Sequence, residues 1–379
     1  MVRVKCLQRY QIPPVVLRSP SPASINSNRV AVHASHNSLC RIFFASGIHV
    51  YQAKFDLKDE MIVQGKDSLV IPTEIQDELQ MVEVNKLELS PHRSEIQSVS
   101  ISESECDNNI LLGTADSYGR IVISHVGLMD EGSMFSASPR NTGTGEGGWA
   151  GLAFVPSQPS LIIVARGPAK SIDLYDKDLH VRTMHTLQYP TDLALLETNR
   201  PGSGMDSIVA ITEGAQISIW DLRAHENGGC IQRILGSSTM EPLYAVCGSP
   251  DSNLLGAGGA ERTAMIIDKR KWMVLSRWTN CLKYEITGVS FSAFDSNSIY
   301  VHGLDYEVIC GKWHNGLADH ERKHFAFRGD SRWLGLSKSV NSDILAGWCE
   351  SGSIFAGEAV YDAHDNSIAN GTAANGWID

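Results

Sequence analysis

A strand-sized motif recurs along this chain of 379 residues. Its clearest copy spans 208–223, where two isoleucines alternate with polar residues ahead of Trp220 and Asp221. A period of two predicts a β-strand with one face buried. The place of Trp220 recurs in seven copies, at Tyr51, Ser124, Tyr175, Trp220, Ile267, Gly311 and Gly357.

The spacing of these copies constrains the fold most strongly. They lie 73, 51, 45, 47, 44 and 46 residues apart, and five of these intervals are close to the roughly 40–45-residue repeat of a four-stranded propeller blade. The longest interval contains an acidic insertion, 56–91, and the next a Gly/Ser-rich loop, 128–148. The chain therefore predicts an all-β fold: one seven-bladed β-propeller over residues 1–361, with four antiparallel strands in each blade.

A ring of sheets must close, because an open strand edge pairs readily with other chains. The segment 2–7 alternates like a strand, and we expect this N-terminal strand to close the ring by pairing beside 353–358. The Asn/Gly/Ala-rich end, 362–379, predicts a flexible tail.

The sequence does not decide between helix and strand in the acidic insertion. Thr73-x-x-Gln76 could begin a short helix, whereas Val82-x-Val84 favours a strand. From Asp56 to Leu89 it holds nine acids and three lysines, about half of the net charge of −11. An acidic balance of this kind disfavours non-specific binding to nucleic acid.

Three segments resemble the WD40 repeat family: Trp220-Asp221, His92-x3-Ile96-x2-Val99, and Gly113-Thr-Ala-Asp116. The resemblance covers about 28–358. It implies a hydrogen bond between His92 and Asp116 within one blade, with a Ser or Thr as a third member. The family's Trp at the fourth place is Ser124 in this chain.

An acid also recurs just before the motif strand. It can accept hydrogen bonds from the backbone amides of a tight turn, which is a structural task. The five examples are Asp116, Glu213, Glu261, Asp305 and Glu350.

The sequence Trp220-Asp221-Leu222-Arg223 is more specific. It resembles the box of WD40-like substrate receptors that dock on the adaptor of cullin-RING ubiquitin ligases. Asp268-Lys-Arg270 repeats the arginine in the next copy. A guanidinium can make a bidentate contact with a partner, although a structural role for both arginines is the alternative. The candidate partner-binding residues are Trp220, Asp221, Arg223, Asp268 and Arg270.

Three further patterns have weaker functional interpretations. Gly143-x-Gly145-x-x-Gly148 precedes a strand rather than a helix, so we favour a loop over a dinucleotide site. His320 and His324 have the spacing of a metal pair, but we expect a solvated loop there. The basic run 269–272 favours a charged turn, with its tryptophan and Trp278 packed between blades, over contact with nucleic acid.

The function expected is therefore a non-enzymatic scaffold for other proteins, and its specific form would be a cullin-RING substrate receptor. The alternative is a structural subunit of another nuclear or cytoplasmic complex, in RNA processing, trafficking or the cytoskeleton. We expect no catalytic residue, cofactor, metal or small-molecule substrate, because Gly-x-Ser-x-Gly, P-loop and His-Glu-x-x-His motifs do not occur. No apolar run approaches 18 residues, which argues against a membrane span. The eight cysteines contain no CxxC and predict buried free thiols.

Overall fold

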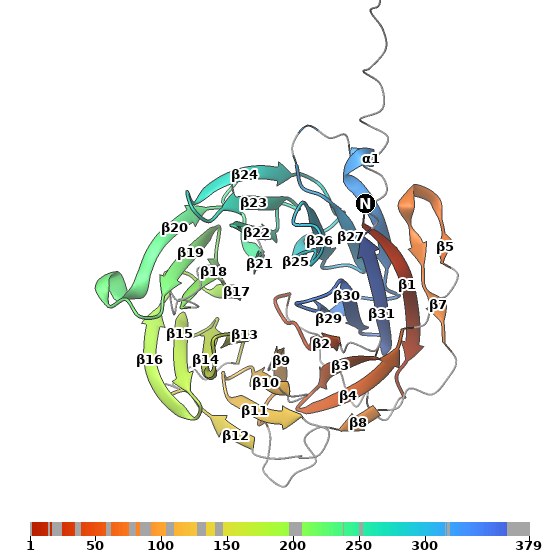
Figure 1. Ribbon diagram of the computed structural model, residues 1–379. Helices are drawn as coiled ribbons and strands as arrows, with labels where there is room; N and C mark the ends of the chain where they lie inside the picture. Colours follow the sequence, from red (N-terminus) through yellow and green to blue (C-terminus); the bar gives the residue numbers. More distant parts are fainter. Residues whose placement is uncertain are drawn as a thin grey trace, which may run out of the picture.

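The computed structural model describes residues 2–13, 16, 25–34, 39–57, 62–75, 81–83, 92–103, 110–126, 134–140, 147–196, 207–237, 239–249, 253–314, 316 and 319–361. Seven antiparallel sheets stand in a ring around a central channel, with the innermost strand of each nearest the centre (Figure 1). We number them as blades 1 to 7 along the chain. The predicted seven-bladed propeller is confirmed.

Within each blade the strands follow one another from the inner to the outer position. Blade 1 is β2 (Val30–Ala34), β3 (Leu39–Ser46), β4 (His49–Asp56) and β8 (Met81–Glu83); blade 2 is β9 (Ile96–Glu103), β10 (Ile110–Asp116), β11 (Ile121–Val126) and β12 (Met134–Ala137); blade 3 is β13 (Ala150–Val155), β14 (Gln158–Arg166), β15 (Ser171–Asp176) and β16 (Leu179–His185); blade 4 is β17 (Pro190–Leu195), β18 (Ile208–Glu213), β19 (Gln216–Asp221) and β20 (Cys230–Leu235). Blade 5 is β21 (Leu243–Gly248), β22 (Leu254–Gly259), β23 (Ala264–Asp268) and β24 (Met273–Trp278); blade 6 is β25 (Ile286–Phe291), β26 (Ser298–Gly303), β27 (Glu307–Lys312) and β28 (Lys323–Arg328); blade 7 is β29 (Trp333–Lys338), β30 (Ile344–Cys349), β31 (Ser353–Tyr361), β1 (Val2–Gln11) and a fifth strand, β7 (Thr73–Glu74). Outside the blades lie β5 (Val63–Gln64), η1 (Lys66–Ser68), β6 (Val70–Ile71), η2 (Glu226–Gly229) and α1 (Asp319–Arg322).

The seven repeat positions all fall in the third strand of a blade. They lie in β4, β11, β15, β19, β23, β27 and β31. One copy of the motif therefore corresponds to one sheet, which is why the spacing alone predicts the number of blades.

Apolar packing joins each sheet to both of its neighbours. Among the described residues, seven buried clusters each span two adjacent blades. Trp220 is 1% exposed between blades 3 and 4, and Trp348 is fully buried between blades 7 and 1, with its ring 5.1 Å from that of Phe44. Because apolar side chains cover both faces of a sheet, each blade needs two neighbours, and the ring supplies them.

The N-terminal strand closes this ring. β1 runs antiparallel to β31, from Val2 opposite Tyr361 to Gln11 opposite Ser353, with an irregularity between Val4 and Cys6. The predicted pairing is confirmed, and it extends four residues beyond the segment 2–7. Figure 1 shows the two ends of the described chain side by side in blade 7.

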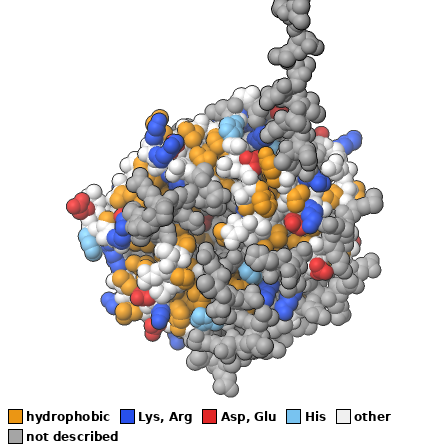
Figure 2. Space-filling model, viewed as in Figure 1, with side chains coloured by type: hydrophobic (Ala, Val, Ile, Leu, Met, Phe, Trp, Pro, Cys, Tyr) orange, Lys and Arg blue, Asp and Glu red, His pale blue; other side chains and the backbone are white. Residues whose placement is uncertain are grey.

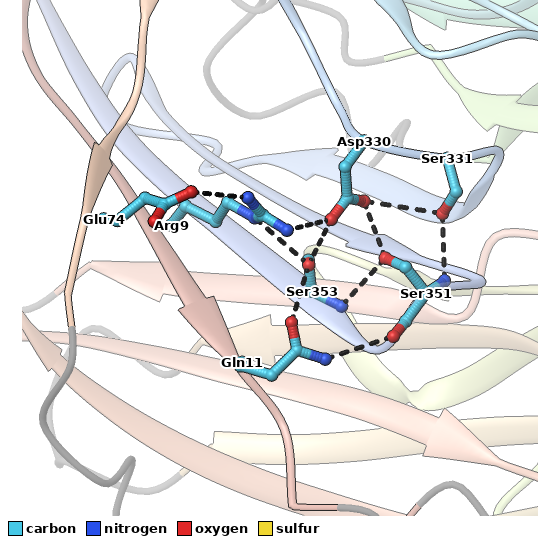
Figure 3. A network of polar contacts seen from close by, with 7 residues as sticks. All are labelled: Arg9, Gln11, Glu74, Asp330, Ser331, Ser351 and Ser353. Atoms are coloured by element: carbon cyan, nitrogen blue, oxygen red, sulfur yellow. Dashed lines mark hydrogen bonds and ion pairs between the residues drawn. The ribbon is translucent and has the colours of Figure 1, made fainter.

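Side chains reinforce this closure at the end of β1 (Figure 3). The Arg9 guanidinium donates to Glu74 at 2.7 Å and also binds Asp330, which lies ahead of β29. Ser353 donates to Gln11 across the β1–β31 pair at 3.1 Å. The network thus joins the N-terminal strand, the acidic insertion and the last blade.

The acidic insertion has defined structure in its described parts. β8 supplies the outer strand of blade 1, and β7 pairs in parallel with β1. Thr73 therefore belongs to a strand and does not begin a helix, because the outer edge of β1 offers its backbone partners. The expected loop 128–148 likewise contains β12, the outer strand of blade 2, and the tail 362–379 lies outside the described residues.

A buried carboxylate links blades 6 and 7. Asp343 is fully buried and accepts hydrogen bonds from Ser292, from the Ala293 amide and from the Tyr300 hydroxyl at 2.8 Å. The ammonium of Lys338 lies 3.5 Å from it. A buried charge is tolerated only where such partners replace water.

We expect Asp343→Ala to lower the free energy of unfolding by about 3–5 kcal/mol, because it leaves the Lys338 ammonium buried without its counter-ion. Urea denaturation followed by tryptophan fluorescence measures the change. Asp178→Ala, at an exposed turn, is the control and should stay within about 0.5 kcal/mol of wild type. Equal stability of the two variants would contradict this role for Asp343.

Candidate functional site

The candidate docking residues lie at the turns that join the third and fourth strands of blades 4 and 5. Trp220 ends the apolar run of β19 and is buried, and its indole Nε1 donates to Ser218 at 2.8 Å. It therefore fixes the strand end and does not present a surface to a partner. Asp221, the last residue of β19, begins the exposed part of the site.

The Asp221 carboxylate holds the Arg223 side chain in a two-pronged contact. Arg223 Nε donates to Asp221 Oδ1 and Nη2 donates to Oδ2, both at 3.1 Å, and the Arg223 backbone amide also donates to Oδ1 at 3.0 Å. The Arg223 side chain is 50% exposed. Burial acts to raise the pKa of Asp221, but the Arg223 hydrogen bonds outweigh it and hold that pKa below its usual value.

Blade 5 repeats this arrangement. Arg270 Nε donates to Asp268 Oδ1 at 3.1 Å, Nη2 donates to Oδ2 at 2.9 Å, and the Arg270 amide donates to Oδ1 at 2.8 Å. Hydrogen bonds from Arg270 lower the pKa of Asp268. Asp268 is 6% exposed and Arg270 is 68% exposed.

We call Asp221, Arg223, Asp268 and Arg270 the paired rim. Both forks occupy the same turn in neighbouring blades, so they lie at the same end of the propeller. Each carboxylate sets the direction of its guanidinium, and the unused N–H groups remain exposed. A fixed, exposed guanidinium is suited to an acidic or carbonyl-bearing protein surface.

The His92 interpretation is confirmed. His92 Nδ1 lies 3.3 Å from Asp116, and its Nε2 lies 2.7 Å from Thr114, which supplies the third member. All three side chains are buried within or against blade 2. Asp116 also accepts the amides of Tyr118 and Arg120, each at 3.0 Å, as the turn argument predicts.

The longer acids act differently from Asp116. Glu213 accepts the amide of Gln188, and Glu261 accepts the amide of Thr239 at 2.9 Å, so both bind the loop that precedes their blade. The additional methylene group lets a glutamate reach past its own turn.

The expectation of a solvated loop is wrong at His324, and His320 lies in a helix and not in a loop. Asp319–Arg322 forms the short helix α1, and His324 lies in β28, 7% exposed, with Nε2 3.1 Å from Ser298. Burial lowers the pKa of His324 to about 4. No group of three metal-ligating side chains occurs within the part of the chain that is described.

The remaining patterns serve the fold where the structure describes them. Trp272 packs against the cluster between blades 4 and 5 and Trp278 against that between blades 5 and 6, as expected. The glycine motif reaches the described chain only at Gly147 and Gly148, and β13 follows it, as expected for a loop. Seven cysteines are described, all as free thiols, and six of them are buried. No described helix has the length and apolarity needed to cross a membrane.

Sequence reasoning missed a polar cavity of about 270 Å³ in the central channel. Asp192, Tyr244, His302 and Lys338 line it from four different blades. Desolvation raises the pKa of Asp192 to about 7, although its carboxylate accepts the amides of Leu193 and Val246 at 2.8 Å. No short motif could reveal this group, because its neighbours come from strands far apart in the sequence.

Comparison with known proteins supports the fold. No family model and no curated protein sequence matches the chain. Among 1478 matching chains of solved structures is one from the "Crystal Structure of Mitotic Checkpoint Complex", with a TM-score of 0.64 and 14% sequence identity. The match covers 96% of this chain and 94% of that one. At this identity the likeness shows the propeller fold alone.

We expect the double variant Arg223→Ala/Arg270→Ala to unfold at a urea concentration close to that of wild type, because both guanidiniums are exposed and each aspartate keeps its hydrogen bond from a backbone amide. Trp220→Ala should cost about 3–5 kcal/mol, since it empties a buried site between two blades. Chemical denaturation of the three proteins separates the two effects. A large loss of stability in the arginine variant would assign the paired rim to folding.

A second expectation concerns Asp192. Its pKa of about 7 exceeds the ordinary value, so between pH 4 and 7 the folded protein holds a proton that the unfolded chain releases. Asp192 therefore makes the free energy of unfolding fall as pH rises through this window. Asp192→Asn should remove that contribution, changing the difference between the two proteins by at most about 1.4 kcal/mol per pH unit.

Denaturation at several pH values measures this difference. Burial lowers the pKa of both His302 and His324 to about 4, so these groups act in the opposite direction. They are present in both proteins and cancel in the comparison. A difference that does not vary between pH 4 and 7 would contradict the raised pKa.

Proposed function

We propose that this protein is a non-enzymatic, WD40-like interaction scaffold, and that its paired rim docks on the adaptor of a cullin-RING ubiquitin ligase. In this role the propeller is a substrate receptor. The propeller acts as one rigid unit located in the cytoplasm, the nucleus or both. The partners are proteins, without nucleic acid, membrane, cofactor or small-molecule substrate.

One observation carries this proposal: two consecutive blades hold an exposed arginine in the same carboxylate fork. The second copy keeps Asp268 and Arg270 although Ile267 replaces the tryptophan. The aspartate–arginine contact is therefore repeated in blade 5, whereas the buried tryptophan is not. A pair of preoriented guanidiniums on neighbouring blades supports a docking role better than a purely local one.

The alternative is a structural subunit of another nuclear or cytoplasmic assembly, in RNA processing, trafficking or the cytoskeleton. The observation that favours it is that both forks are already closed within the chain, each arginine pairing with its own aspartate. In that case the arginines stabilise their turns, and the segments 56–91 and 128–148 are the candidate partner-binding elements.

Affinity purification with mass spectrometry tests the proposal. We expect the wild-type protein to recover the ligase adaptor and its cullin, and Arg223→Ala/Arg270→Ala to lose both, because the paired rim supplies the contact. Arg262→Ala is a matched control, since this exposed arginine lies on blade 5 in the turn between β22 and β23, at the opposite end of the sheet.

Retention of the ligase components by the control and their loss from the double variant would support a substrate receptor. If wild type recovers no ligase component, or the double variant recovers the same set, the paired rim is structural. The proteins that do co-purify would then identify the assembly that this propeller serves.

A further inference from the structure

The outermost strands of blades 3, 4 and 5 expose large apolar side chains. On β16, Leu179 is 64% exposed, and on β24 Met273 is 60% exposed. On β20, Ile231 and Leu235 are 47% and 58% exposed. Among the described strands, each of these three pairs along one edge only. An unpaired edge beside exposed apolar side chains is a template for another strand.

The outer strands of blades 6 and 7 are covered instead. The segment 62–75 lies against them: Leu69 forms a bridge with Ala326 of β28, and β7 pairs with β1. Val70 is only 3% exposed in this packing. The segment 62–75 therefore does not cover the outer strands of blades 3 to 5.

The contact between β7 and β1 shows how this propeller accepts an added strand. Glu74 pairs with Arg9 of β1 at 2.7 Å (Figure 3). The Ile75 amide donates to the Arg9 carbonyl at 2.9 Å. An acidic, extended segment thus binds an outer strand through its backbone and through one carboxylate–guanidinium pair.

β20, like β1, is an outer strand that carries an arginine, but no described strand is added to it. Arg233 is exposed at its middle, between Ile231 and Leu235, and no acid of the described residues pairs with its guanidinium. Arg223, in the turn between β19 and β20, is held by Asp221, and in the turn between β23 and β24 of blade 5 Arg270 is held by Asp268 while Lys271 is exposed. Figure 2 shows hydrophobic side chains interspersed with basic and acidic ones over this part of the molecule. Because Asp221 and Asp268 neutralise Arg223 and Arg270, the uncompensated positive charge of the described residues here is that of Arg233 and Lys271, with the exposed Glu226 ahead of β20.

We propose that the outer edge of β20 binds an extended, acidic segment of a partner protein by strand addition. An acidic side chain of that segment pairs with Arg233, and apolar side chains next to it cover Ile231 and Leu235. This interface is separate from the paired rim, so either can fail without the other.

A synthetic peptide that copies residues 69–78, Leu-Val-Ile-Pro-Thr-Glu-Ile-Gln-Asp-Glu, is the probe. It contains β7, the strand that this propeller already adds to an outer strand. With the full-length protein, we expect it to slow amide hydrogen exchange in 230–235. In fluorescence anisotropy, Arg233→Glu should weaken binding at least tenfold, and added salt should weaken binding to wild type.

Two controls define the site. Arg328→Glu changes an exposed arginine on β28, an outer strand that is already covered, and should leave the affinity unchanged. A peptide with lysine in place of its Glu74 should bind at least tenfold more weakly. Protection confined to β1, or equal affinity of Arg233→Glu and wild type, would overturn the proposal, because the peptide would then only replace β7 or bind elsewhere.

Discussion

Every part of this structure depends on burying both faces of each sheet. A four-stranded sheet with apolar side chains on both faces is unstable alone, and each blade completes its core only against two neighbours. Cys6 and Tyr10 of β1 belong to the interface between blades 7 and 1, so completing the ring requires β1 to pair with β31. Arg9, Ser353 and Asp330 hold that junction, and Asp343 joins blade 7 to blade 6 from the other side.

This constraint also decides where function can lie. The blade interfaces are filled, so contacts with other molecules are left to the turns, the outer edges and the central channel. The paired rim uses the turns of blades 4 and 5, and the proposed strand-addition site uses the outer edge of blade 4. In both proposals the arginines are held in place, Arg223 and Arg270 by their aspartates and Arg233 by its strand, a restraint that lowers the entropy cost of the proposed binding.

Some polar groups stabilise a blade from within, and others orient an exposed side chain. His92, Thr114 and Asp116 are buried, pair with one another and stiffen blade 2. Asp221 and Asp268 instead each direct an exposed guanidinium outward. Asp192 belongs to neither group, because its burial in the channel raises its pKa to about 7 without a cationic hydrogen-bond partner among the described residues. An aspartate can thus stabilise a blade, orient an arginine or have a raised pKa, according to its surroundings.

The repeat spacing and strand alternation were sufficient to predict seven blades, one strand of each and the closing role of segment 2–7, because these follow from local alternation and from the need to close a ring; that this strand is the third of its blade came from the structure. The Asp-x-Arg repeat was also visible, since each fork forms between residues two positions apart. Other features were decided only by tertiary structure. Thr73 is a strand because β1 offers it an edge, His324 is buried because β28 completes blade 6, and the surroundings of Asp192 come from four blades. In each case the deciding partner lies far away in the sequence, and only the closed ring brings it into contact.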